Sequence, residues 1–441
     1  MRRILGRLDW ARVWFIASCA VVVFAYGVAV GRYQLFPFRI LNFGVYSLHQ
    51  VRAEARMLLG IRPDWHLGPA EHEGDGVTVV MPERMAPGPT LISGMIDGEN
   101  ELRLIEPDGT PIRTWEVHFT ELFDLTDDPR SARLPQRDWN AQIHGALALP
   151  DGSVVFNFDY AGTVRLDRCG EMRWVLPETT HHSIEPSRDG GFWIPGRRYT
   201  DVVAGFPRTD SEYEEDLILK VSGDGEILDS IPTAELLVEN GLLHLLLFKG
   251  PGSVFRPGEV VHLNDIEELP DSIADRFPQF EAGDLLLSFR NLFLLMVVDP
   301  RTRRIKWHQI GPWIHQHDPD FQPDGTITIF DNRNDDRQDG SHLGGSQILS
   351  LDPMTGQTRV LYGGVPGQAM HTFILGKHQV LANGNLLITQ ALSGRILEAT
   401  PEGDLVWELI NRHDEEQIAY LTQANRYPPS YFDVQDWTCP E

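Results

Sequence analysis

Five histidines recur at corresponding positions of an internal repeat in this 441-residue chain. In three copies the histidine stands eight residues before the glycine of a tight turn, as His144 does before Gly152. A fourth copy is stretched, and a fifth carries a longer insert before its turn. Because imidazole acts near neutral pH as a base, a nucleophile or a metal ligand, such a series can carry chemistry. The five residues are His144, His182, His262, His317 and His371.

Arginine and asparagine side chains follow in the same copies, at the end of the strand after the turn. An antiparallel return brings the end of that strand beside the histidine, so both sets are expected at one face of the molecule. Arginine binds sulfate, phosphate or carboxylate through paired hydrogen bonds, and an oxyanion site is therefore predicted there. The residues are Asn157, Arg197, Arg198, Arg290, Asn291, Asn332, Arg333 and Arg337, with Gln390 and Ser393 in the last copy.

Two other interpretations stay open at this point. Four imidazoles can hold iron or another transition metal, although neighbouring arginines would repel a cation. The histidines can also bridge neighbouring parts of the fold by hydrogen bonds, in which case the face binds a protein or an anionic glycan without catalysis. Motifs of zinc proteases, serine hydrolases and nucleotide-binding loops do not occur in a suitable context.

A four-stranded unit is predicted to position these residues. Its first half is the histidine, a strand, a turn such as Pro-Asp-Gly and a second strand; its second half is a strand, a turn and a strand that often ends in tryptophan. Six units of roughly 50 residues fill 89–411, as expected of β-propeller blades. The predicted fold class is all-β, a six-bladed β-propeller whose innermost strands line a central channel. Strand 76–80 is expected to complete the last blade.

The N-terminal residues differ from this pattern. Arg2, Arg3, Arg7 and Arg12 precede an uncharged, strongly apolar stretch, Val13–Gly31, which is long enough for a short transmembrane helix. The predicted organisation is a cytoplasmic tail and transmembrane anchor at 1–31, a stem helix and linker at 32–75, the six-bladed propeller at 76–412, and a C-terminal tail packed on the propeller at 413–441.

The arginines before the apolar stretch indicate its orientation. Arginine-rich flanks stay in the cytoplasm, so the chain is expected in the cell inner membrane as a single-pass protein with a cytoplasmic N-terminus and a periplasmic propeller. A cleaved signal peptide is the alternative. Cys169 and Cys439 would then lie in an oxidising compartment, where a disulfide and two separate thiols are both compatible with the sequence.

The net charge of −25 bears on the partners of the protein. A phosphate backbone needs a basic surface, so nucleic acid is excluded as a partner. The inner membrane, through the N-terminal anchor, is the one macromolecular partner that the sequence itself suggests.

Several segments of the repeat resemble the bacterial arylsulfotransferase (ASST) family. They are His315-Gln316-His317-Asp318 leading to Ile329–Asn332, His371-Thr372-Phe373 leading to Asn383–Asn385, Gly283–Asn291, and Gly403–Trp407. The resemblance implies an exported six-bladed propeller that needs no cofactor. It implies the transfer of a sulfuryl group from an aryl sulfate to an acceptor phenol, through a sulfated histidine and without a nucleotide donor. A homodimer is a further expectation.

The family motif assigns roles to individual residues. By this resemblance His371 is the nucleophile, while His317 and His262 polarise the sulfate oxygens or handle the phenol proton. Arg333 or Arg337 would hold the sulfuryl oxygens. The remaining residues of the face are expected to bind or orient the substrate; they are Asn332, Asn264, Arg290, His182 and His144.

Overall fold

The computed structural model describes residues 9–33, 65–126, 128–203, 206–207, 213–247, 258–335, 340 and 342–439. The chain divides into two compact units, residues 1–63 and residues 64–441, which are described separately. The stem helix expected within 32–75 lies mostly outside the described residues, as does Arg337.

The described part of the first unit contains one apolar helix, α1 (Trp10–Tyr33). Within it, Trp10–Val30 is long and apolar enough to cross a membrane. Its large side chains, such as Trp14 and Phe24, are exposed rather than packed against protein. The helix therefore has the length and the outward apolar surface that a single membrane span requires, and it is compatible with membrane anchoring.

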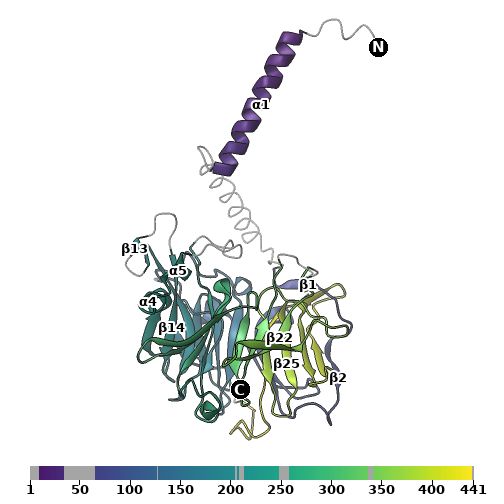
Figure 1. The fold of residues 1–441 in the computed structure, drawn as a ribbon. Coiled ribbons are helices and arrows are strands. Elements are labelled where there is room, and N and C mark those ends of the chain that lie inside the picture. The colour runs from purple at the N-terminus through teal and green to yellow at the C-terminus, as the bar shows by residue number, and fades with distance from the viewer. Residues whose placement is uncertain are drawn as a thin grey trace. The chain divides into compact units, whose positions relative to one another are not determined.

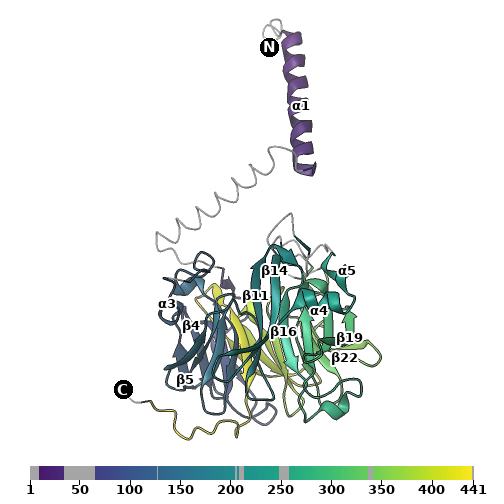
Figure 2. The same cartoon turned by 90° about the vertical axis from the view of Figure 1, so that its left-hand side faces the viewer.

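The second unit is a six-bladed propeller of antiparallel sheets, arranged around a central axis (Figures 1 and 2). From the inner strand outward, the first three sheets are β29 (Leu421–Arg426), β3 (Thr90–Ile96), β4 (Glu99–Ile105) and β5 (Pro111–Glu116); β6 (Ile143–Ala148), β7 (Val154–Phe158), β8 (Gly162–Leu166) and β9 (Met172–Leu176); and β10 (Glu185–Pro186), β11 (Phe192–Thr200), β14 (Tyr213–Val221) and β15 (Ile227–Pro232).

The last three sheets follow the same order. They are β16 (Leu263–Glu268), β17 (Leu285–Phe289), β18 (Leu294–Asp299) and β19 (Arg304–Ile310); β20 (His317–Phe321), β21 (Ile327–Asp331), β22 (Gln347–Asp352) and β23 (Gln357–Tyr362); and β24 (Lys377–Val380), β25 (Leu386–Gln390), β26 (Arg395–Ala399), β27 (Leu405–Ile410) and β2 (Gly76–Val80).

Short elements connect or flank the blades. They are β1 (Leu67–Pro69) paired with β28 (Gln417–Ala419), β12 (Val202–Val203) paired with β13 (Phe206–Pro207), the helices α3 (Phe119–Leu122), α4 (Thr233–Glu239) and α5 (Leu243–Leu246), and the 3-10 turns Asp138–Asn140, Ala274–Arg276, Arg290–Leu292 and Ala391–Ser393.

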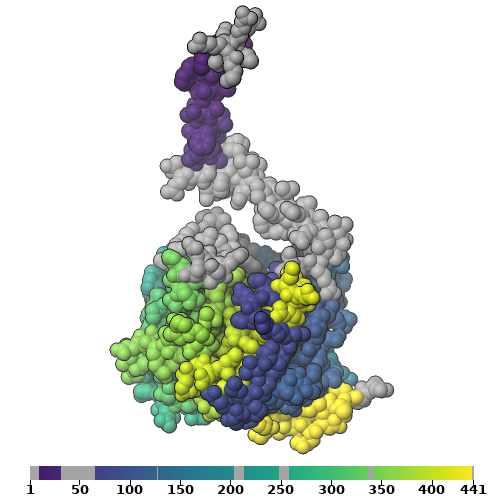
Figure 3. Space-filling model, turned by 90° about the vertical axis from the view of Figure 1, so that its right-hand side faces the viewer, coloured from purple at the N-terminus to yellow at the C-terminus, as the bar shows by residue number. Residues whose placement is uncertain are grey.

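Two strands from opposite ends of the chain close the ring. Strand β2 pairs with β27 and adds a fifth, outermost strand to the last blade, as the sequence predicts for 76–80. Figure 3 shows this early segment, in dark blue, lying among yellow residues from the end of the chain. Strand β29 pairs with β3 as the innermost strand of the first blade. The expected propeller boundary at residue 412 is therefore too early, because 421–426 belong to the sheet. Part of the segment 413–441, expected as a tail, thus forms the innermost strand of the first blade.

Tryptophans in outer strands tie three of the blades to the next. Their indole N–H groups donate to backbone carbonyls in turns of the following blade, and each such bond contributes about 1 kcal/mol. The bonds run from Trp115 to Asp167 at 3.0 Å, from Trp174 to Gly223 at 2.9 Å, and from Trp407 to Pro107 at 2.7 Å.

A disulfide joins Cys169 to Cys439. It connects the turn between β8 and β9 with the C-terminal segment, where the Trp437 ring lies edge-on to Trp115 at 6.4 Å. The Tyr431 hydroxyl donates to the carbonyl of Ala148 at 2.9 Å. The last residues thus pack on the first two blades, and of the two states that the sequence left open the structure contains the disulfide.

Candidate active site

Four of the five repeat histidines meet in the central channel. Each lies at the start of an inner strand: His144 within β6, His182 three residues before β10, His262 directly before β16, and His317 at the first residue of β20. Ring centroids of His182 lie 4.0 Å from His144, 4.8 Å from His262 and 6.1 Å from His317. His182 is therefore the centre of the cluster, and the predicted convergence of these four residues is confirmed.

Positive backbone φ angles help to aim two of these rings. His182 and His262 have φ values of 57° and 55°, in the left-handed region that side chains other than glycine seldom adopt. Each residue stands at the point where the chain turns into an inner strand. Such a conformation costs about 1–3 kcal/mol and is held by the surrounding structure, and it is common at functional sites.

A hydrogen-bond acceptor faces the Nδ1 atom of three rings. His144 Nδ1 lies 3.0 Å from Asp159 Oδ1, and His262 Nδ1 lies 2.9 Å from Glu259 Oε1. His317 Nδ1 lies 2.6 Å from the side-chain oxygen of Asn332, whose amide nitrogen donates to two backbone carbonyls. An acceptor at Nδ1 keeps the proton on that atom, so the Nε2 atom presents its lone pair.

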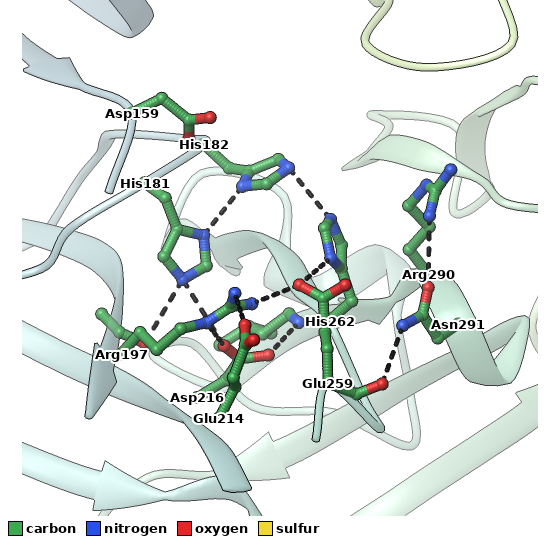
Figure 4. A network of polar contacts seen from close by, with 12 residues as sticks. Asp159, His181, His182, Arg197, Glu214, Asp216, Glu259, His262, Arg290 and Asn291 are labelled. Atoms are coloured by element: carbon green, nitrogen blue, oxygen red, sulfur yellow. Dashed lines mark hydrogen bonds and ion pairs between the residues drawn. The ribbon is translucent and has the colours of Figure 1, made fainter. Parts of the chain in front are cut away.

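The Nε2 atoms of His182 and His262 face each other (Figure 4). These two atoms are 3.2 Å apart, and His182 Nδ1 lies 2.8 Å from His181 Nδ1. The other nitrogen of His181 faces Asp216 and the carbonyl of Gly196, so it carries hydrogen and His181 Nδ1 accepts from His182. The lone pair of His182 Nε2 therefore points at the Nε2 atom of His262, and a proton placed between the two atoms would bridge them.

The electrostatics of the cluster favour neutral rings at its centre. Burial and the neighbouring rings hold the pKa of His182 well below its usual value. Burial and the charge of Arg290 do the same for the pKa of His317. Burial opposes ionisation of Glu259, but His262 and Arg197 together lower the pKa of that carboxyl. The site thus combines neutral imidazole lone pairs with one ionised carboxylate beneath them.

The two buried arginines of the site differ in their surroundings. Arg197 forms ion pairs with Glu214, with Asp216 at 2.8 Å and with Glu259 at 2.9 Å, so its charge is balanced within the fold. Arg290 is 5% exposed, its pKa is lowered by burial, and its Nη1 donates to Asn291 at 3.2 Å. Arg290 is therefore a second buried cation of the site.

His315 is a member of the site that the histidine spacing did not single out. It is 4% exposed, and neither ring nitrogen has a hydrogen-bond partner in the described part of the chain. Burial, Arg290 and His262 lower its pKa to about 3. The repeat spacing also missed Glu259, Asp159 and His181, because none of them stands at the repeat position; their closeness to a repeat residue in sequence was the available signal.

His371 lies outside the ring contacts that join the other four. Its ring centroid is 6.3 Å from that of Phe373. Its Nδ1 atom packs against Gly340, 2.4 Å from the position that a Cβ atom on this glycine would occupy. Both ring nitrogens are buried and have no hydrogen-bond partner among the described residues. The next residue, Thr372, accepts a hydrogen bond from Asn332 at 2.8 Å, so the backbone at His371 is tied to the residue that orients His317.

The remaining predicted residues have mixed surroundings. Arg333 is half-buried with φ of 48°, and its backbone N–H donates to Ile314 at 3.1 Å. The amide nitrogen of Asn264 donates to Gln316 at 2.7 Å. Asn157 spans two blades by bonding the backbone at Gly145 and His182, which is a structural role. A narrow pocket at the centre is lined by His144, His182, Asn264, His317, Lys377 and Thr422.

A protein-family model matches the part of the chain that contains most of these histidines. Residues 145–412 match the family model described as Arylsulfotransferase (ASST). The match spans more than half of the chain and includes His182, His262, His317 and His371. The chain belongs to the arylsulfotransferase (ASST) family. No curated protein matches it.

Solved structures resemble the ASST-family chain only distantly. A protein of unknown function from Bacteroides caccae is 13% identical, with 77% of this chain and 98% of that chain covered and a TM-score of 0.49. Virginiamycin B lyase from Staphylococcus aureus is 12% identical, with coverages of 61% and 70% and a TM-score of 0.34. A chain of a nidogen/laminin complex is 13% identical, with coverages of 76% and 97% and a TM-score of 0.42.

Proposed function

We propose that this protein is a periplasmic, membrane-anchored aryl sulfotransferase that moves a sulfuryl group from a phenolic sulfate ester to an acceptor phenol through a sulfated histidine. Membership of the ASST family supports the reaction class. The observation that carries the proposal is the channel cluster, in which hydrogen-bond acceptors hold Nδ1 and leave the Nε2 lone pairs facing inward beside Arg290.

The first half-reaction forms the sulfated enzyme. The Nε2 lone pair of the nucleophile, His371 by the family motif, attacks sulfur, and the bond between sulfur and the aryl oxygen breaks with its electron pair on that oxygen. A proton held between the Nε2 atoms of His182 and His262 would neutralise the leaving phenolate. Arg290, together with Arg333 or Arg337 from the family motif, would hold the sulfuryl oxygens.

The second half-reaction reverses these bond changes with a new phenol. The acceptor hydroxyl gives its proton to the histidine that lost one, and its oxygen attacks sulfur. The bond between sulfur and nitrogen breaks, and the electron pair returns to Nε2. His317, whose lone pair is fixed by Asn332, is placed to receive the proton or to polarise a sulfate oxygen.

Kinetics with two substrates test the proposal. The detergent-solubilised full chain should release nitrophenol from p-nitrophenyl sulfate faster when a phenol is added, with parallel double-reciprocal lines that indicate a ping-pong reaction. His371→Asn should lower turnover by about 1,000-fold or more, because it removes the nucleophile. The exposed His308 offers a matched control, and His308→Asn should retain full activity. A wild-type chain that transfers no sulfuryl group would overturn the proposal.

Localisation belongs to the same proposal. The arginines before α1 favour a cytoplasmic N-terminus, and the Cys169–Cys439 disulfide is suited to the oxidising periplasm. Protease added to spheroplasts should therefore digest the propeller of the membrane-bound chain. Protection of the propeller until the inner membrane is lysed would contradict this orientation.

A further inference from the structure

His315 is a buried histidine beside the cluster to which the proposed reaction gives no role. It lies two residues before β20, at the start of the fifth blade. Neither of its ring nitrogens has a hydrogen-bond partner in the described part of the chain. A buried polar group without a partner is destabilising, so a ligand that forms a hydrogen bond with this ring would recover free energy.

The backbone at His315 has the conformation of two histidines in the cluster. Its φ of 55° lies in the left-handed region, as do the φ values of His182 and His262, and all three residues stand where the chain turns into an inner strand. The corresponding turn of the last blade has Leu375, with φ of 61°. By backbone conformation His315, rather than His317, is the counterpart of His182 and His262 in its blade. Strained positions of this kind are common at functional sites.

The segment that carries His315 packs against the turn that carries Arg290. The indole N–H of Trp313 donates to the carbonyl of Phe293 at 2.7 Å. Phe293 directly follows the 3-10 turn that begins at Arg290, and its ring lies edge-on to that of His315 with centroids 5.0 Å apart. On the other side, His317 Nδ1 lies 3.2 Å from the carbonyl oxygen of His315. The ring of His315 is therefore held between the Arg290 turn and the start of β20.

The charge of the neighbouring residues decides in which form His315 can act. Burial, and then the charges of Arg290 and His262, lower the pKa of His315 to about 3. The ring is therefore neutral near pH 7, with hydrogen on one nitrogen and a lone pair on the other. A neutral imidazole beside a cation is a poor base, but its N–H group can donate a hydrogen bond to a negatively charged oxygen.

We propose that His315 donates its ring N–H to an oxygen of the sulfuryl group, next to Arg290, and so forms part of a binding subsite for a tetrahedral oxyanion. This inference rests on the function proposed above. The donor is preorganised, because the fold fixes the backbone of His315 and places no competing acceptor on its ring among the described residues. His315 forms no covalent bond and moves no proton in this role.

Binding of inorganic sulfate to the full chain in detergent tests the subsite without catalysis. Isothermal titration calorimetry measures the affinity. His315→Leu removes the donor and should weaken sulfate binding by about 10-fold. His315→Gln keeps an N–H donor at this position and should retain most of the affinity. The exposed His308 offers a control, and His308→Leu should bind sulfate as the wild type does.

Thermal unfolding separates a donor from a residue that only packs. His315→Leu removes an unpartnered polar group from a buried position, so its Tm should rise by about 2 °C while its affinity for sulfate falls. His315→Met, which also lacks a donor, serves as the second variant if His315→Leu does not fold. A wild-type chain that binds no sulfate, unchanged affinity in the two apolar variants, or His315→Gln binding no better than His315→Leu would overturn the proposal.

The rate of sulfuryl transfer from p-nitrophenyl sulfate distinguishes this inference from the proposed function. The rate should fall by about 100-fold in His315→Leu and be partly restored in His315→Gln. A wild-type chain that binds sulfate through His315 but transfers no sulfuryl group would support the subsite and overturn the proposed function. Full transfer activity in His315→Leu would support the function and overturn the subsite.

Discussion

At the scale of single residues, the site depends on which ring nitrogen carries hydrogen. Asp159, Glu259 and Asn332 each accept from an Nδ1 atom, and this leaves Nε2 lone pairs in the channel. The five-fold recurrence of histidine could be read from the sequence because it follows the repeat. The acceptors could not, because carboxylates and amides are common on turns and only the folded chain shows which one reaches a ring.

Arg290→Gln is expected to reduce turnover of aryl sulfate by about 100-fold, since a preorganised cation beside the sulfuryl oxygens is lost. It should also move the acid limb of the pH–rate profile to higher pH. Arg290 is one of the causes that lower the pKa of His317, so its removal raises that pKa and neutral His317 then requires higher pH. Arg198→Gln, on a half-exposed side chain, is the control and should shift nothing. An unmoved profile in the Arg290 variant would contradict this arrangement.

Glu185→Gln is expected to change how stability depends on pH. Burial raises the pKa of Glu185 to about 8, above its unfolded value of about 4.5. The stability that protonated Glu185 contributes is present below the unfolded pKa and is lost as pH rises toward the folded pKa. The variant should therefore gain Tm relative to wild type between pH 5 and pH 8.5. The exposed Glu106→Gln is the control, and a gain in the opposite direction would show that Glu185 ionises more easily than its burial implies.

At the scale of elements, the sequence predicts the blade repeat and one of the two strands that close the ring. That strand is β2; the other, β29, was not predicted. Turn glycines and strand-ending tryptophans recur, which gave six units and the place of β2. Strand β29 was missed because Leu421–Arg426 has no turn or tryptophan signature. Contacts with residues distant in sequence hold this strand in place. Buried Arg426 donates to Glu398 at 3.0 Å, and it also donates to the hydroxyl of Thr90 and the carbonyl of Ala86.

Arg426→Met is expected to destabilise the propeller by about 3–5 kcal/mol, because it leaves the buried carboxylate of Glu398 without its cation. Urea unfolding of the full chain measures the loss. Glu398→Gln combined with Arg426→Met should restore part of it, since the two residues act as a pair. A loss below about 1 kcal/mol in the single variant would show that the ion pair does not hold the closing strand.

At the scale of the whole molecule, the sequence predicted the class of fold and the apolar helix from composition and periodicity. It could not decide the state of Cys169 and Cys439, which are 270 positions apart in sequence and meet only when the C-terminal segment packs on the first two blades. The place of His371 relative to the other histidines likewise depends on the path of one long loop, and family resemblance alone assigns its role.

Loss of the disulfide is expected to lower stability by about 2–4 kcal/mol, since the cross-link restricts the unfolded chain. Cys169→Ser, Cys439→Ser and the double variant should show the same reduced Tm, because each breaks the same bond. Wild-type chain with dithiothreitol should match them. Alkylation of both thiols in the untreated, folded chain would contradict the pairing.

The central claim is a covalent sulfohistidine, and mass spectrometry tests it most directly. The full chain is incubated briefly with p-nitrophenyl sulfate and no acceptor, and its intact mass is measured before and after a phenol is added. The account predicts a gain of roughly 80 Da that the phenol removes and that peptide mapping places on His371. Turnover without any adduct, or an adduct that persists in His371→Asn, would contradict it.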